Sequence, residues 1–346
     1  MAKGYGRPPM GRKGGKGMGM GMPGLNMDMI KQAQKMQQDM MRMQQELQEK
    51  EYQAAAGGGG RGMRLCEMPE DVIPAFELVK SEARKAFGND DIFIEKYLVQ
   101  PKHIEVQILA DQYGNVRHLG ERDCSLQRRY QKVVEFAPAW SVPESIREQL
   151  HADAVKIAEA VGYVNAGTVE FLVDRDGNHY FIEMNPRIQV EHTVTEMVTG
   201  IDLVRAQILI AEGHPLSTPE IGIPSQDAVH MNGYALQCRV TTEDPANNFA
   251  PDTGRITAYR SGGGFGVRLD GGNAFTGAEI SPYYDSLLGK LIVRAGTREE
   301  AVRKMKAALC ELVIEGVETN IAEQLELVSD PRFMSGGYDL TFMEGR

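Results

Sequence analysis

Residues 183–192, with the sequence EMNPRIQVEH, place a polar side chain at every second position. In an extended chain, alternate residues point to the same face, so these side chains would form one row. Pro186 argues against helix and helps to keep the segment extended. At a rise of about 3.3 Å per residue, the row would be roughly 26 Å long. Its members are Glu183, Asn185, Arg187, Gln189 and Glu191.

The carboxylates of this row could bind a divalent cation. Glu170, on the strand expected to pair with this one, stands between apolar Val169 and Phe171 and is predicted to share the face of the row. Two carboxylates on paired strands repel each other unless one is protonated or a cation lies between them. Together with Asn185, Glu170 and Glu183 offer only oxygen ligands, which suits Mg²⁺ or Mn²⁺ completed by phosphate and water.

Further along the row, Arg187 is suited to an anion, and Glu191 is placed to act as a base on that anion. The alternative for the whole row is a solvated sheet face with alternating charges. That alternative gives no reason for two carboxylates and an asparagine beside the apolar positions of FIE and FLV. We therefore favour a site for a metal and an anion.

A second dense cluster, ERDCSLQRRYQKVVE at residues 121–135, gathers cations around Cys124 and Gln127. We interpret it as an anion-binding loop that faces the carboxylate row, the alternative being a solvated basic loop. Cys124 is assigned to packing by default. The cations are Arg122, Arg128, Arg129 and Lys132.

A third candidate is the glycine run in YQAAAGGGGRGMRL, residues 52–65. Glycines permit positive φ and a close backbone approach, so that successive N–H groups can converge on phosphate oxygens. A flexible linker has the same composition. The run also lacks the G-x-x-x-x-G-K-[ST] pattern of a P-loop, so alone it is a weak signal.

Hydrophobic periodicity supplies the elements that must position these residues. Helices are predicted at about 28–52, 69–88, 143–162 and 298–313, with helical patterns also over 193–213. Strands are predicted at 91–98, 103–111 and 131–138, a hairpin at 167–185, and several short strands over 233–295. The alternation of Ile104, Val106 and Ile108 predicts a half-buried strand. The mixture predicts an α/β (α+β) fold.

Composition bounds the possibilities. The chain has 346 residues and a net charge of -10, but residues 1–50 hold nine Lys/Arg and four Asp/Glu, giving +5 there and -15 elsewhere. A basic head on an acidic body suggests two units of different origin. The four cysteines form no C-x-x-C, which favours a reducing compartment. No apolar run approaches the ~20 residues of a membrane span, and no secretory signal is recognised.

Long ordered motifs from about Gly57 to Arg346 resemble the biotin carboxylase module of biotin-dependent carboxylases, which has an ATP-grasp fold. Within that group, EHTVTE, RVTTEDP and PDTGRI are most similar to pyruvate carboxylase. The motifs that carry the resemblance are EKYL, HIEVQILAD, GERDCSLQRRYQKVVEFAPA, GTVEFLV, FIEMNPRIQVEHTVTEMVTGIDLV, QCRVTTEDP, GGGFGVRLD and SPYYDSLLGKLI.

The resemblance implies a two-step ligase reaction. ATP phosphorylates bicarbonate to carboxyphosphate, and the released CO₂ carboxylates the ureido nitrogen of biotin. It implies Glu191 as the base, Arg239 as the group that stabilises the biotin enolate, and Lys132 in the same anion pocket. Bicarbonate would contact Arg187, Gln189 and Val190. The metal, Mg²⁺ or Mn²⁺, would be held by Glu170, Glu183 and Asn185.

The same resemblance implies an ATP site. A mobile lid over the phosphates would consist of Gly57, Gly58, Gly59, Gly60 and Arg61. The segment that hydrogen-bonds adenine would include Glu95, Lys96 and Leu98. His103 and Gln127 would contact the ribose or the phosphates. Where the family has a phosphate-binding lysine before the lid, this chain has Gln53, which lacks the charge for a charge-assisted contact.

The head has a different resemblance. GMPGLNMDMIKQAQKMQQDMMRMQQELQEKEYQAAAGGG is similar to the start of the YbaB family of small nucleoid-associated, DNA-binding proteins. We therefore expect a chimera joined at the glycine run, with a biotin carboxylase module truncated at its N-terminus and possibly inactive. DNA binding through the basic helix is the alternative function.

Five regions are expected. Residues 1–25 form a disordered basic Gly/Met tail, 26–56 a YbaB-like helix, and 57–98 a truncated ATP-grasp small lobe with the lid. Residues 99–225 form the large lobe with the metal and bicarbonate strand, and 226–346 the biotin carboxylase C-terminal domain. The expected partners are a biotin carrier, a carboxyltransferase domain and further copies of the chain. Nucleic acid and membranes are not expected partners. The expected location is the cytoplasm, or the mitochondrial matrix in a eukaryote.

Overall fold

The computed structural model describes residues 64–66, 68–92, 97–272 and 274–344. The chain divides into two compact units, Met1–Tyr97 and Leu98–Arg346. The helix predicted at 28–52, the glycine run and residues 93–96 of the strand predicted at 91–98 lie outside the described residues, and the other four residues of that strand are not extended in a ladder.

The described part of the first unit is mainly one helix. A short 3-10 turn, η1 (Pro69–Asp71), leads into α2 (Val72–Phe87). The helix ends at Gly88, which adopts φ 71° and donates its N–H to the Arg84 carbonyl. The helix predicted at 69–88 is therefore confirmed, including its glycine stop.

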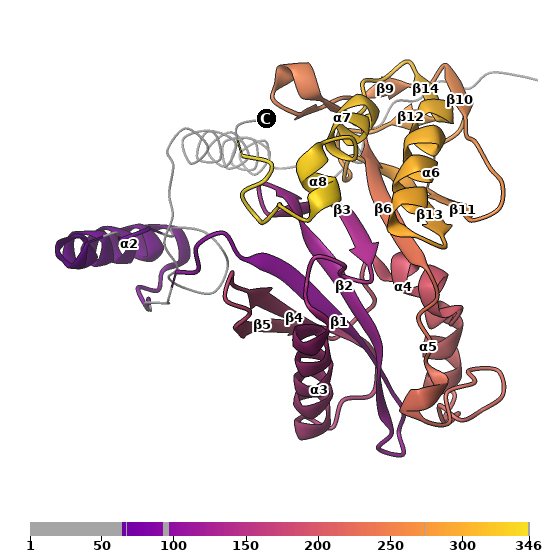
Figure 1. The fold of residues 1–346 in the computed structure, drawn as a ribbon. Coiled ribbons are helices and arrows are strands. Elements are labelled where there is room, and N and C mark those ends of the chain that lie inside the picture. The colour runs from indigo at the N-terminus through magenta and orange to yellow at the C-terminus, as the bar shows by residue number, and fades with distance from the viewer. Residues whose placement is uncertain (1–63, 67, 93–96, 273, 345–346) are drawn as a thin grey trace, which may run out of the picture. The chain divides into compact units, whose positions relative to one another are not determined.

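The second unit is built on one eight-stranded antiparallel sheet (Figure 1). Its strand order is β11-β13-β6-β3-β2-β1-β4-β5. The first five strands along the chain are β1 (Lys102–Ala110), β2 (Val116–Arg128), β3 (Gln131–Ala137), β4 (Asn165–Val173) and β5 (His179–Asn185). The other three are β6 (Tyr234–Thr241), β11 (Val267–Gly271) and β13 (Leu287–Ala295).

Three two-stranded ribbons and several helices complete this unit. The ribbons pair β7 (Glu243–Asp244) with β8 (Ala250–Pro251), β9 (Gly254–Arg255) with β12 (Glu279–Ile280), and β10 (Ala258–Arg260) with β14 (Val313–Glu315). The helices are α3 (Glu144–Ala160), α4 (His192–Thr199), α5 (Leu203–Ala211), α6 (Arg298–Glu311), α7 (Ile321–Leu327) and α8 (Pro331–Ser335). The 3-10 turns are η2 (Gln226–Ala228) and η3 (Pro245–Asn247).

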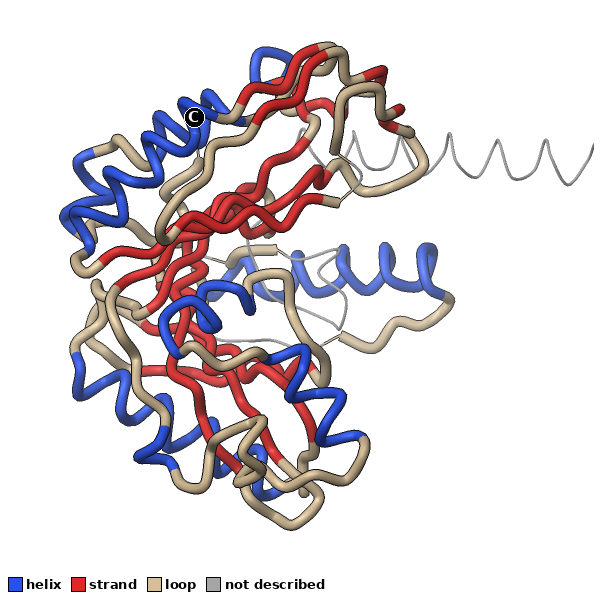
Figure 2. Tube along the Cα trace, turned by 90° about the vertical axis from the view of Figure 1, so that its right-hand side faces the viewer, coloured by secondary structure: helices blue, strands red, loops and turns tan. Residues whose placement is uncertain are grey.

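Helices cover both faces of the β1–β4 part of the sheet (Figure 2). Ile104 and Val106 of β1 share a core cluster with Leu150 of α3, whereas Leu109 shares one with Leu203 of α5. Because neighbouring residues of a strand point to opposite faces, α3 and α5 lie on opposite sides. At the other end of the sheet, α6 packs on β13 and β6.

Strand β1 is buried on both faces, so the prediction of a half-buried strand is wrong. The predicted apolar alternation is present, but the residues between are buried as well, with Glu105 and Gln107 fully inaccessible. Alternation in sequence reports two chemically different faces, and it does not tell whether the polar face meets water or a buried polar site.

The helical patterns over 193–213 form two helices, α4 and α5. Gly200 ends α4 at φ 74°, a left-handed conformation that favours glycine. Asp202 then starts α5 by accepting the Arg205 N–H on its side chain. Among the described residues, no helix combines the length and the apolar character that crossing a bilayer requires.

We expect Gly233→Ala to cost much more stability than Gly200→Ala. Both glycines have φ near 75°, but a Cβ at Gly233 would lie 2.3 Å from the Ala295 carbonyl oxygen, whereas one at Gly200 meets nothing within 4 Å. Left-handed backbone alone costs about 1–2 kcal/mol, and overpacking adds about 1–3 kcal/mol. Urea denaturation of both variants checks this. Equal losses of unfolding free energy would contradict it.

Candidate active site

A pocket of about 410 Å³ opens in the second unit, where β1 to β6 and the segment before β13 meet. It brings together most of the predicted site residues that the structure describes. Leu98, predicted to lie near adenine, is described but does not line this pocket. Gly57 to Gly60, Arg61, Glu95 and Lys96 lie outside the described residues. The predicted residues that line it are His103, Gln127, Lys132, Glu170, Glu183, Asn185, Arg187, Gln189, Val190, Glu191 and Arg239.

The row predicted along residues 183–192 curls around the pocket instead of running straight. Strand β5 ends at Asn185, and the next residues bend until Glu191 precedes the first turn of α4. Pro186 explains the change, since it cannot donate a backbone hydrogen bond to continue the ladder. Gln189 and Glu191 are buried whereas Arg187 is exposed. The single straight row of roughly 26 Å is therefore wrong, although all its members line one pocket.

The β4–β5 hairpin sets two carboxylates side by side. Glu170 pairs directly with Glu183 in the ladder. The amide Nδ2 of Asn185 donates to Glu170 Oε1 at 3.0 Å and to Glu183 Oε1 at 2.9 Å, so both carboxylates converge on one amide. With the amide turned over, Asn185 would present its oxygen at the same place. This all-oxygen donor set fits Mg²⁺ or Mn²⁺.

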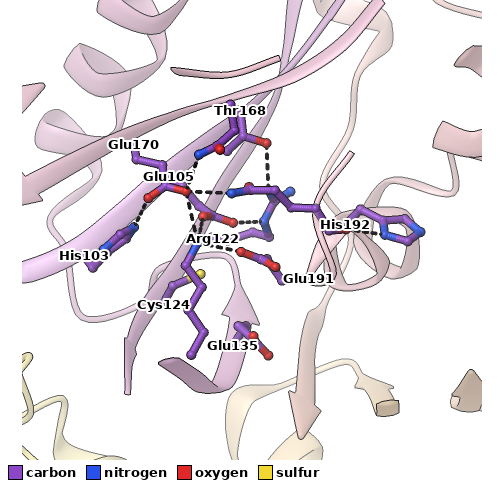
Figure 3. Close-up of polar contacts among 12 residues, drawn as sticks. His103, Glu105, Arg122, Cys124, Glu135, Thr168, Glu170, Glu191 and His192 are labelled. Atoms are coloured by element: carbon purple, nitrogen blue, oxygen red, sulfur yellow. Dashed lines mark hydrogen bonds and ion pairs between the residues drawn. The ribbon is translucent and has the colours of Figure 1, made fainter. Parts of the chain in front are cut away.

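A buried ammonium holds the centre of the pocket. Lys132 Nζ lies 2.5 Å from Glu105 Oε2, 2.6 Å from Glu191 Oε1 and 3.2 Å from Glu170 Oε1. Burial disfavours the charged amine, but the three carboxylates outweigh it and raise the pKa of Lys132 well above its usual value. Lys132 is thus a permanent cation. Figure 3 shows Glu105, Glu170 and Glu191 converging on this centre.

Among the residues that the structure describes, two groups of His, Cys and Glu side chains have atoms close enough to hold a metal. One combines His103, Glu105 and Glu170, and the other combines Glu105, Cys124 and Glu191. Each includes carboxylates that already contact the Lys132 ammonium. In the β4–β5 hairpin only Glu170 contacts this ammonium, whereas Glu183 and Asn185 do not, so the hairpin is the better candidate for a divalent ion.

Arg122 is a buried residue of β2 that donates hydrogen bonds to residues of the site. It does not belong to a solvent-facing loop. It is fully buried on β2 and donates from Nε to Glu105. Its two Nη atoms donate to four neighbouring oxygens at 2.8–3.3 Å, of which Figure 3 labels that of Thr168. The acceptors are Gln107 Oε1, Thr195 Oγ1, Thr168 Oγ1 and Gln189 Oε1.

The other cations of the predicted anion-binding loop lie at the β2–β3 hairpin. Its turn is Arg129–Tyr130, with φ of 50° and 65°, as in the type I′ turns that suit hairpins. Arg129 is exposed and donates to Asn248 Oδ1 at 2.7 Å. Arg128 lines the pocket but is paired with Glu243 at 2.5 Å. Of the four cations, only Lys132 contacts a carboxylate of the predicted row, at Glu191, whereas Arg122 contacts the row at Gln189.

Electrostatics keep the central carboxylates ionised. Burial opposes the charge of Glu105, but Arg122 and Lys132 lower its pKa to about 2. Burial likewise opposes the charge of Glu170, and His103, Lys132 and Gln189 lower its pKa to about 2. His103 Nε2 lies 2.8 Å from Glu170 Oε2, and its Nδ1 lies 3.2 Å from Gln127 Nε2.

Sequence reasoning missed Glu105 and Glu135, which are both fully buried beside the pocket. Glu105 contacts Lys132 and Arg122, and Glu135 contacts Arg239. A signal for Glu105 existed. His103, Glu105 and Gln107 alternate along β1 as the polar residues of 183–191 do, and the first two of that row, Glu183 and Asn185, lie on the same sheet.

Sequence comparison identifies the fold family. The family of the carbamoyl-phosphate synthase L chain, ATP binding domain, matches residues 22–219, which is more than half of the chain. The biotin carboxylase C-terminal domain matches residues 237–345. The chain therefore belongs to this ATP-binding family, in its biotin carboxylase branch, and its mixed fold matches ATP-grasp biotin carboxylases.

Within that class, the chain is similar to pyruvate carboxylases. It is 55% identical over 285 residues to the pyruvate carboxylase of Bacillus subtilis (strain 168), a match that covers 82% of this chain and 25% of that protein. The chain thus spans about a quarter of the length of the curated relatives that it matches.

Two solved structures are also similar. Biotin carboxylase from Campylobacter jejuni, solved as a βγ-ATP complex, gives a TM-score of 0.76 at 45% identity, covering 84% of this chain and 63% of that one. The biotin carboxylase domain dimer of 2-oxoglutarate carboxylase from Hydrogenobacter thermophilus, solved with MgADP, ADP and bicarbonate, gives 0.76 at 46% identity, covering 88% and 66%.

We expect acid to destabilise the fold through Glu105. Its pKa is about 2 in the folded chain against an ordinary 4.5, so its stabilisation is complete above 4.5 and is lost as the pH falls toward 2. The full loss is on the order of 3 kcal/mol. Urea titrations between pH 5 and 2.5 should give a smaller pH slope of unfolding free energy for Glu105→Gln. An unchanged slope would contradict this assignment.

Proposed function

We propose that this chain catalyses the ATP-dependent carboxylation of biotin by bicarbonate. The observation that carries the proposal is the convergence of Glu191, Arg239 and Lys132 with the bend at residues 187–190 in one pocket. Membership of the biotin carboxylase branch supports it. So do the similar structures, which were solved as complexes with βγ-ATP or with MgADP, ADP and bicarbonate.

The first half-reaction would take place at the bend after β5. Arg187, Gln189 and Val190 line the pocket on one side and would bind bicarbonate, whose charge suits the Arg187 guanidinium. Glu191 would accept the bicarbonate proton, so that an anionic oxygen attacks the terminal phosphorus of ATP and ADP leaves. Lys132 and Arg239 lie within 2.9 Å of the two Glu191 oxygens and keep this carboxylate fixed beside the anion.

Glu170, Glu183 and Asn185 would hold the magnesium or manganese ion. When bound, that ion would neutralise charge on the phosphates of ATP. His103 and Gln127 lie at the Glu170 end of the pocket and would contact the ribose or the phosphates. The glycine lid with Arg61, and the adenine segment with Glu95, Lys96 and Leu98, complete the proposed nucleotide site.

The second half-reaction would use Arg239. Carboxyphosphate would split into CO₂ and phosphate, the phosphate would take the N–H proton of the biotin ureido group, and that nitrogen would attack the carbon of CO₂. As that proton leaves, negative charge develops on the ureido oxygen, and the Arg239 guanidinium would stabilise it. Lys132 would add positive charge to the same space.

We further propose the partners and setting of this module. A biotin carrier would deliver the acceptor, a carboxyltransferase domain would use the product, and copies of the chain would associate. These proposals rest on the similarity to pyruvate carboxylases. We propose that the chain consists of five regions, with boundaries at residues 25, 56, 98 and 225. The proposed location is the cytoplasm or the mitochondrial matrix, in line with the four free cysteines.

For residues 26–59 we propose a separate origin, from a YbaB-like helix. The Met/Gln-rich pattern and the +5 charge of residues 1–50 support it. The match of the ATP-binding family from residue 22 onward argues against it. Nucleic-acid binding through this head is the alternative function and rests on the charge alone.

We expect the full chain to release ADP from ATP in a bicarbonate-dependent reaction that free biotin stimulates. Glu191→Gln should lower this rate by about 100-fold or more, because a general base contributes about that much. A coupled ADP assay measures both. The control is Glu279→Gln. Glu279 is exposed, pairs with Arg255 and does not line the pocket, so this variant should release ADP at the rate of the parent. Full activity in Glu191→Gln would overturn the assignment of the base.

We expect Glu183→Gln to weaken Mg-ADP binding by about ten-fold, a loss of about 1.4 kcal/mol, without unfolding the chain. Glu183 is exposed on β5, so the substitution leaves the core intact. The thermal midpoint should rise less with Mg-ADP than in the parent, since a weaker ligand stabilises the native state less. Affinity for ADP with EDTA should be unchanged. An equal loss of ADP affinity with and without magnesium would contradict the assignment of the metal site.

A further inference from the structure

The guanidinium of Arg239 is held between two carboxylates from different elements. Its Nε lies 2.5 Å from Glu135 Oε1 on β3, and its Nη2 lies 2.9 Å from Glu191 Oε2 before α4. Nε–H and one N–H of Nη2 point along the same edge of a planar guanidinium. One edge of the group is therefore fully engaged by two acidic residues.

Glu135 is itself firmly anchored. It is fully buried, and its second oxygen, Oε2, accepts a hydrogen bond from Gln237 Nε2 at 3.0 Å. Gln237 Oε1 in turn accepts the hydroxyl hydrogen of Thr193 on α4. A carboxylate with both oxygens engaged and no solvent around it has a single available orientation. Its Oε1 atom is therefore a hydrogen-bond acceptor at a fixed position for the Nε–H of Arg239.

The backbone of Arg239 is fixed as well. Its carbonyl oxygen accepts hydrogen bonds from Asn320 Nδ2 and from Gln324 Nε2, both at 2.9 Å. Asn320 and Gln324 belong to the start of α7, so a helix outside the sheet holds this point of β6. With both ends of the side chain held, the plane of the guanidinium is determined.

The remaining edge of the guanidinium is available to a substrate. Within the described part of the chain, no partner is found for Nη1, and Arg239 lines the pocket. The Nη1 and Nη2 donors of that edge can form two parallel hydrogen bonds to an anion. Without Glu135, the Nε–H would compete for the same anion or turn toward Glu191.

The charge of Glu135 is tied to Arg239. Burial raises the pKa of the Glu135 carboxyl, Arg239 counteracts this, and Glu191 adds to the rise. Because Arg239 is the one cation that contacts Glu135 within the described residues, the two groups stabilise each other's charge. The pair therefore behaves as one unit.

We propose that Glu135 is the positioning residue for Arg239 in the carboxylation of biotin. By fixing the guanidinium plane, it directs the free edge to the oxygen on which negative charge develops. The inference rests on the proposed function and adds to it a residue that need not touch a substrate. It assigns Glu135 mainly to the second half-reaction, because in the cleavage of ATP Arg239 acts only by holding Glu191, which Lys132 holds as well.

The test compares Glu135→Gln with Glu121→Gln in the full chain. Glu121 is an equally buried carboxylate on the neighbouring strand β2, paired with Arg147 at 3.2 Å and His151 at 2.6 Å, and it does not line the pocket. Both variants lose a buried charge, so both report the stability cost. Only Glu135→Gln should disturb Arg239.

For Glu135→Gln we expect kcat of biotin carboxylation to fall about ten-fold more than the rate of biotin-independent ATP cleavage, while KM for biotin changes less than about three-fold. A contact made mainly in the transition state lowers kcat in this way. Glu121→Gln should change both rates equally. In an Arg239→Lys background, Glu135→Gln should add little further loss. Equal losses in both reactions, or additive losses in the double variant, would overturn the proposal.

Crystal structures of the parent and of Glu135→Gln decide the same point without activity. The parent should keep Arg239 between Glu135 and Glu191, and the variant should show its guanidinium displaced or rotated. An unmoved guanidinium would overturn the positioning role. If the parent fails to carboxylate biotin, the proposed function fails, whereas the displacement still tests the link between Glu135 and Arg239.

Discussion

One buried ammonium is the constraint on which the site depends. Lys132 contacts Glu105, Glu170 and Glu191, which come from β1, β4 and the turn before α4. Without that charge, three carboxylates would be forced together away from water, at a cost of several kcal/mol each. The Glu105–Arg122 pair below it supplies the second cation. The sheet can therefore bury this acidic cluster only because β2 and β3 contribute these two residues.

The surrounding structure serves to keep those charges in register. Each strand delivers its residue through the ladder, with Glu105 opposite Glu170 and Glu170 opposite Glu183. The β2–β3 turn and the α4 N-terminus then bring Lys132 and Glu191 to the same point. Helices α3 and α5 exclude water from the two faces of β1 and β4. Low effective dielectric strengthens every contact inside, which suits chemistry on anions.

Much of this site could be predicted from sequence, because the β4–β5 hairpin has a local pattern. Alternation and a Gly/Asn/Asp turn were enough to pair Glu170 with Glu183 and to gather the residues up to Glu191. The bend after Asn185 was missed, since a proline that favours extended backbone also ends a strand ladder. Glu105 and Glu135 were missed, and Arg122 was assigned to a loop instead of a buried strand, for another reason. Their roles depend on neighbours 15 or more residues away, as with Arg122 and Gln107, and no local period reveals such a partner.

The ladder between β1, β4 and β5 has a consequence for how the sheet finds its register during folding. A strand displaced by one residue exchanges its two faces. If β4 shifted in this way, Glu170 would point into the apolar core between the sheet and α3. Val169 would take its place beside Lys132. The displaced Glu170 would then be a buried charge without a cation, and Lys132 would lose one of its three carboxylates. The acidic cluster therefore disfavours a shifted register during folding, because a mispaired sheet would have to bury an unpaired carboxylate.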